Sequence, residues 1–228
     1  MGEMIEFPSN GGKGRGYVAR PEQGAGLGLL VIQEWWGLVP HIKDVCDRFA
    51  AEGFTALAPD LYHGESATEP DEAGKLMMAL NLDRAAKDLS GAIDWMTASD
   101  AVRGDGIGVI GFCMGGGLAL VVATQRPDAI RAVVPFYGVI PWPTAQPDWP
   151  KLDAPVQGHF AERDGFFTPE KVKELEDTLR GLGKDADLVV YAGVDHAFFN
   201  DTRPDVYDEA AASLAWTRTL EFLRAKLG

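Results

Sequence analysis

The chain has 228 residues, of which 46% are apolar and 24% are charged, and both fractions are ordinary for a globular protein. This composition excludes disorder, collagen and coiled coil as overall descriptions. The net charge is −13, because 34 acidic residues outnumber 21 basic ones. A surface this acidic repels phosphate backbones and anionic lipid, so we expect no nucleic-acid or membrane partner.

Two cysteines, Cys46 and Cys113, in a chain of this length indicate a reducing compartment rather than a disulfide framework. The first ten residues are acidic and lack the apolar core of a signal peptide. The longest apolar runs fall short of the ~18 residues that a membrane span needs. We therefore expect a cytoplasmic protein with one domain over residues 1–228, either a monomer or a small homo-oligomer.

Short apolar runs alternate with helical patterns along the chain. Segments 4–7 and 16–19 are expected to pair as a hairpin across Asn10-Gly11-Gly12. The runs that predict strands buried on both faces are 27–32, 54–58, 107–110, 132–137, 155–160 and 188–191. Helical spacing and caps predict helices near 42–49, 82–96, 117–124, 168–181 and 204–227. This order predicts an α/β fold, a mostly parallel twisted sheet with helices on both faces.

The strongest motif is Gly111-Phe112-Cys113-Met114-Gly115, between a predicted strand and a predicted helix. It is the nucleophile-elbow pattern, with cysteine where serine usually stands. Residues without Cβ let strand and helix pack closely around a strained nucleophile, and the helix N-terminus favours a thiolate. The alternative is a buried structural cysteine in a Gly-rich turn. Cys46, on the apolar face of its helix, is expected to be a small core residue only.

A nucleophile at an elbow is followed in the chain by an acid and then a histidine. His41 and His63 precede Cys113, and His159 lies inside a predicted strand, where we expect a core residue. His196 lies in the loop after the last predicted strand and is the candidate base. Its alternative is a capping or solvent-exposed histidine.

Asp164 follows the predicted strand 155–160 and could fix the histidine tautomer by accepting its N–H. Glu162 is the nearer rival, whereas Asp195 adjoins His196 but is expected to point away. A turn or cap role is the alternative for Asp164.

The loop after strand 27–32 begins Gln33-Glu34-Trp35-Trp36. In elbow hydrolases this loop supplies one backbone N–H of the oxyanion hole, and the residue after the nucleophile supplies the other. Trp35 and Met114 are therefore the expected donors. Glu34 could exchange a proton with the thiol of Cys113, the alternative being a loop carboxylate in water.

The segment from Gly138 to Pro150 is rich in proline and tryptophan. Its Trp142 and Trp149 could wall an apolar pocket beside Phe198 and Phe199, the alternative being packing over the sheet edge. No metal-ligand cluster and no phosphate loop is visible, so no metal or cofactor is expected.

With Gln33-Glu34, the elbow at Cys113, Asp164 and His196, the sequence resembles the dienelactone hydrolase (carboxymethylenebutenolidase) family over nearly its whole length. Ala58-Pro59-Asp60-Leu61-Tyr62 matches as well. The resemblance implies an α/β-hydrolase fold, with Cys113 as nucleophile, His196 as base, Asp164 as its orienting acid and Glu34 as the carboxylate that controls the thiol. The side chains expected to bind substrate are those of Trp36, Tyr62, Phe198 and Asn200.

The dienelactone-cleaving members hold the substrate carboxylate with two arginines, and this sequence departs from both. Asn200 stands four residues past His196, and segment 69–78 offers Lys75 but no arginine. The arginines that could compensate are Arg84, Arg163 and Arg203. The resemblance thus implies an enzyme that cleaves a small-molecule lactone or small ester through a thioester acyl-enzyme. The alternatives are a carboxylesterase or thioesterase on the same scaffold, and a non-hydrolytic protein that binds a small ligand or senses oxidants.

Overall fold

The structure is a computed structural model that describes residues 2–138 and 140–228. The strands are β1 (Glu3–Ser9), β2 (Gly12–Ala19), β3 (Gly26–Ile32), β4 (Phe54–Pro59), β5 (Val102–Phe112), β6 (Ile130–Phe136), β7 (Val156–Arg163) and β8 (Ala186–Asp195). The helices are α1 (Pro40–Ala51), α2 (Pro70–Ala79), α3 (Leu82–Thr97), α4 (Met114–Gln125), α5 (Pro169–Gly181) and α6 (Glu209–Leu227), with a 3-10 turn at Trp149–Lys151.

All the strands above lie in one sheet, in the order β1-β2-β4-β3-β5-β6-β7-β8. Strand β2 pairs antiparallel with both β1 and β4, and every other neighbouring pair is parallel. The predicted mostly parallel sheet is therefore confirmed. Its carboxyl ends from β3 to β8 lie along one edge, and the loops that leave this edge bring distant parts of the chain together.

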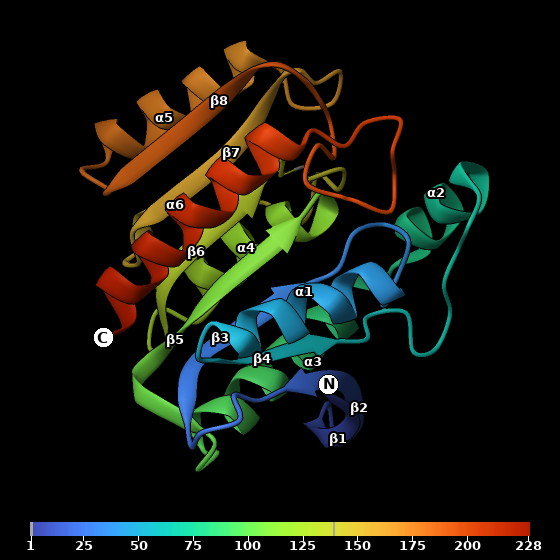
Figure 1. Ribbon diagram of the computed structural model, residues 1–228, viewed down its shortest axis with the longest axis vertical. Coiled ribbons are helices and arrows are strands. Elements are labelled where there is room, and N and C mark those ends of the chain that lie inside the picture. Colours follow the sequence, from blue (N-terminus) through green and yellow to red (C-terminus); the bar gives the residue numbers. More distant parts are fainter. Residues whose placement is uncertain (1, 139) are drawn as a thin grey trace.

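Strand β3 shows why a continuous apolar run predicts such a strand. All of its residues are buried. Leu30 and Ile32 face a core built with α3, α4 and α5, whereas Leu29 and Val31 face a second core built with α1 and α6. Figure 1 shows these helices on the two sides of the sheet. Neither face of β3 meets water, so neither needs polar residues.

The opening hairpin also forms as predicted. Asn10 and Gly11 make its turn with φ of 52° and 72°, and Gly12 already pairs with Ser9 in the ladder. Two consecutive positive φ values suit an Asn-Gly turn between right-twisted strands.

Two helices differ from the sequence pattern. Helix α6 begins at Glu209, later than predicted, because the Asp208 side chain caps it by accepting the N–H of Ala211 at 2.8 Å. Helix α2 is absent from the helices that spacing and caps predict; it fully buries only Ala73, and its Leu76 and Met77 lie partly buried against the core. Among the helices of residues 2–138 and 140–228, none combines the length and the apolar character of a membrane-spanning segment.

Candidate active site

The bend between β5 and α4 places Cys113 in a strained backbone, with φ of 55° and ψ of −120°. The strain is held by close backbone contacts on both sides. A Cβ on Gly111 would collide with the carbonyl of Gly115, and a Cβ on Gly115 would collide with the carbonyls of Ile32 and Gln33. Only glycine fits these two positions, so the turn presents the cysteine at the carboxyl edge of the sheet.

His196 and Asp164 come from the loops after β8 and β7, which are neighbours in the sheet. Their Nδ1 and Oδ2 atoms lie 2.7 Å apart. The Oδ1 atom of Asp164 accepts the backbone N–H groups of Phe166 and Phe167, at 2.8 and 3.0 Å. The carboxylate is therefore oriented by its own loop before it meets the imidazole.

The electrostatics of this pair follow from burial and hydrogen bonding. Burial alone would lower the pKa of His196, but hydrogen bonds to Asp164 and Cys113 and the charges of both raise it to about 10. Burial would raise the pKa of Asp164, but the bond from His196 and the two backbone N–H groups hold it below its usual value. At neutral pH the pair is an imidazolium and a carboxylate.

Glu34 lies two residues past the end of β3 and is only 1% exposed. Its Oε2 accepts the amide of Asn200 at 2.8 Å, and its Oε1 lies 3.4 Å from the hydroxyl of Tyr137, which donates to it. Burial, together with the nearby Glu34 and Cys113, raises the pKa of Tyr137 well above its usual value, so the phenol stays a donor.

Cys113, His196 and Glu34 line one cavity of about 300 Å³. Trp35 and Trp36 line it too, as their place in the early loop suggested. The structure thus brings the predicted nucleophile, base and carboxylate to a common space, with Asp164 behind the histidine.

Three predicted substrate contacts lie elsewhere. Tyr62 is buried with its hydroxyl 3.4 Å from the sulfur of Met114, and Phe198 is fully buried among core aromatics. Asn200 is 2% exposed, and its amide is bound to Glu34. None of the three is among the residues that line the cavity. These residues lie in loops near the cavity, but their side chains are buried in the protein and do not face the cavity.

The tryptophan-rich segment also differs from the pocket interpretation. Trp142 is buried in the core of α3, α4 and α5, with Trp149 packed against it, whereas Phe198 and Phe199 belong to the core on the other face of the sheet. Residue 139 of this segment lies outside the described residues. Within the described part, Trp142 and Trp149 therefore pack on the core of that face and do not line the cavity.

The rivals for the acid have other partners. Glu162 accepts the N–H of Gly193 at 2.7 Å, and Asp195 pairs with Arg163 at 2.9 Å. His159 is fully buried between the Tyr191 and Thr219 hydroxyls, at 2.9 and 3.1 Å, and burial lowers its pKa to about 3.

Sequence reasoning did not assign Met77, Phe166 or Val206 to the cavity wall, although all three line it. They come from α2, from the loop after β7 and from the segment before α6. Of the three, only Phe166 could have been predicted from the sequence, because it is an aromatic residue two positions past the candidate acid Asp164.

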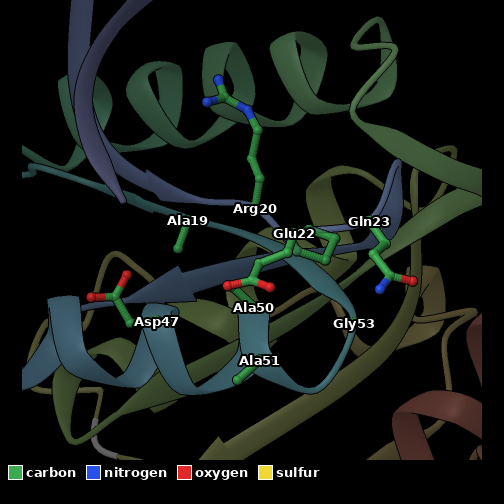
Figure 2. Close-up of a pocket in the computed structure, with 9 residues that line it drawn as sticks. Ala19, Arg20, Glu22, Gln23, Asp47, Ala50, Ala51 and Gly53 are labelled. Carbon is green, nitrogen blue, oxygen red and sulfur yellow. The ribbon is translucent and has the colours of Figure 1, made fainter. Parts of the chain in front are cut away.

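A second, larger cavity of about 530 Å³ lies near Arg20, Glu22 and Asp47 (Figure 2). Its other walls come from the segment before β3 and from Gly53, just before β4, so it sits at the amino ends of these strands. Because Cys113 lies at the carboxyl end of β5, this cavity is at the opposite edge of the sheet. Among the described residues, no cysteine or histidine lines it. In residues 2–138 and 140–228, no group of three His, Cys, Asp or Glu side chains could hold a metal ion.

The model of the dienelactone hydrolase family matches residues 15–227. The chain belongs to this family. It is 41% identical to "Protein usf" of Aquifex pyrophilus and 38% identical to the "Putative carboxymethylenebutenolidase" of Aquifex aeolicus, in both cases over all of this chain and all of the relative. It is therefore a hydrolase of the dienelactone hydrolase type.

Solved structures of dienelactone hydrolases share its architecture. The structure of a "Putative Dienelactone Hydrolase" from Klebsiella pneumoniae superposes with a TM-score of 0.88 at 29% identity and covers 98% of both chains. The fold is that of the α/β-hydrolases, as the sequence predicted.

Proposed function

We propose that this dienelactone hydrolase homologue uses Cys113 as a nucleophile and cleaves a lactone or small ester through a thioester acyl-enzyme. One observation carries the proposal. The strained elbow at Cys113 and the imidazole of His196, itself bound to Asp164 at 2.7 Å, line the same cavity. An elbow, a base and an orienting acid together are the arrangement of an activated nucleophile.

The protonation states suggest how the reaction proceeds. His196 is protonated at neutral pH, and an imidazolium beside the sulfur of Cys113 stabilises the thiolate. The thiolate attacks the ester carbonyl carbon. As the tetrahedral intermediate collapses, the bond to the alcohol oxygen breaks and the imidazolium donates its proton to that oxygen. The neutral imidazole then takes a proton from water, whose oxygen attacks the thioester carbon and displaces the thiolate.

In both tetrahedral intermediates the former carbonyl oxygen carries a negative charge, which hydrogen-bond donors must stabilise. Met114 is the first residue of α4, so its N–H has no partner within the helix. Trp35 lines the cavity from the opposite loop. These two backbone N–H groups are our proposed oxyanion hole, and one well-aimed donor lowers such a barrier by roughly 3–4 kcal/mol.

Glu34 is our proposed control on the thiol. Its carboxylate is buried in the wall of the cavity that Cys113 also lines, and it is bound by the neutral groups of Asn200 and Tyr137. With only neutral donors bound to it, Glu34 has no competing cation and can exchange a proton with the thiol of Cys113.

The test uses p-nitrophenyl acetate without added metal or cofactor. We expect hydrolysis by the parent and by Cys46→Ala, and none by Cys113→Ala. Mass spectrometry of the parent should show an acetyl adduct that decays. Unchanged turnover in Cys113→Ala would refute the nucleophile, whereas an adduct on Cys113 that persists without turnover would favour the non-hydrolytic alternative.

A further inference from the structure

The cavity beside Cys113 has apolar walls, and each of its arginines already has a carboxylate partner. From this we propose that the site selects uncharged esters with apolar substituents and disfavours esters that carry a carboxylate. The inference deepens the proposed function and rests on it. It concerns which ester is accepted, not whether one is cleaved.

The apolar wall comes from four separate segments. Met77 lies on α2, Trp35 and Trp36 follow β3, and Val206 precedes α6. Phe166 follows β7 and is 61% exposed, with its ring centroid 5.2 Å from that of His196. A large aromatic side chain left in water beside the base gains free energy when an apolar group covers it.

Two guanidinium groups line the cavity, and each is already paired. Arg163 bonds Asp195 at 2.9 Å and also donates to the carbonyl of Gly193. Arg203 bonds Asp205 at 2.8 Å and lies over the ring of Trp36, 5.8 Å from its centroid. These carboxylates are tethered by the chain, so a substrate carboxylate must compete with a partner at high effective concentration.

The remaining charges on the wall leave no excess of positive charge. Among the described lining residues, the carboxylates of Glu34 and Asp195 offset the two guanidiniums, and the imidazolium of His196 is paired with Asp164 behind it at 2.7 Å. The chain as a whole carries −13. An entering carboxylate would lose its hydration without gaining an unpaired cation.

Asn200 offers no alternative anchor. Its amide nitrogen is bound to Glu34, and its carbonyl oxygen accepts the N–H and the hydroxyl of Thr202, at 3.1 and 2.6 Å. The side chain is also 2% exposed and is not among the residues that line the cavity, so it does not present its amide to a substrate carboxylate.

The test compares two esters with the same leaving group and the same six-carbon acyl chain. One is p-nitrophenyl hexanoate, and the other is mono-p-nitrophenyl adipate, which ends in a carboxylate. After subtraction of the enzyme-free rate, we expect kcat/KM for the hexanoate to be higher by about tenfold or more. Equal or higher kcat/KM for the adipate would overturn the proposal. Hydrolysis of neither ester would instead refute the proposed function.

A variant tests the physical cause. Asp205→Asn removes the partner of Arg203 without changing the shape of the side chain, so kcat/KM for the adipate should rise several-fold while that for the hexanoate stays within about twofold. The double variant Asp205→Asn with Arg203→Met should lose the gain. Glu6→Gln on β1, whose carboxylate is paired with Lys13 at 2.6 Å, is the matched control because it changes the net charge equally. An adipate gain of the same size in Glu6→Gln would refute the local pairing.

Discussion

The imidazole of His196 lies between a carboxylate and a thiol, and its pKa reports both. Because the groups around it raise that pKa to about 10, we expect its ring protons to titrate near pH 10 in the NMR spectrum of the folded protein. Asp164→Asn should lower the midpoint, since the amide carries no charge to stabilise the imidazolium. A midpoint that does not move would contradict the pairing of the two residues.

His159 is an internal control in the same spectrum. Burial lowers its pKa to about 3, so its ring should stay neutral throughout the titration of His196.

The raised pKa of His196 also makes the stability of the fold depend on pH. The folded-state pKa of His196 lies above an unfolded value of about 6.5, so its stabilising contribution is complete below that pH and is lost as the pH rises through about 10.

At the scale of elements, the elbow depends on how closely β3, β5 and α4 approach one another. A Cβ at position 115 would meet backbone carbonyls of β3 and of the loop after it, which cannot move as a side-chain end could. We expect Gly115→Ala to lower the free energy of unfolding by about 1–3 kcal/mol, as overpacking does, measured by urea denaturation.

Gly181→Ala is the matched control for that substitution. Gly181 is the last residue of α5, and a Cβ there would meet no atom within 4 Å. The change should therefore stabilise the protein by about 0.5–1 kcal/mol, the usual preference for alanine in a helix. Equal losses in both variants would show that the elbow is no more tightly packed than a helix end.

The sequence predicted best those elements whose surroundings are uniform. The continuous run of β3 and the stripe of α3 each meet one kind of environment along their length, and their patterns show it. Helix α2 buries only Ala73 fully, and its Leu76 and Met77 are only partly buried against the core, so its surroundings are mixed along its length.

Some residues of the candidate site could be predicted from the sequence, and others could not. Cys113 has a local motif, and His196 and Asp164 follow from the order of residues that an elbow requires. Phe166 and Val206 reach the cavity only because loops far apart in sequence meet at one sheet edge. Whether the other predicted residues reach the cavity depends on the direction of their side chains. No pattern indicated that Asn200 would turn inward to Glu34.

At the scale of the whole molecule, the charge of −13 acts on an anionic substrate before it reaches the cavity. Screening shortens the reach of that field from about 30 Å at 0.01 M salt to about 8 Å at 0.15 M. We therefore expect kcat/KM for mono-p-nitrophenyl adipate to rise about two- to fivefold over this range, because repulsion during approach weakens.

The uncharged p-nitrophenyl hexanoate should show no such rise, because the field does no work on it. The effect of the Arg203–Asp205 ion pair on the adipate rate can then be distinguished from the effect of the net charge. Asp205→Asn should raise the adipate rate at every salt concentration, whereas salt should raise it in the parent and the variant by a similar factor. An adipate rate that is flat with salt in both proteins would mean that the net charge does not reach the cavity, and the preference for neutral esters would then depend on the paired arginines alone.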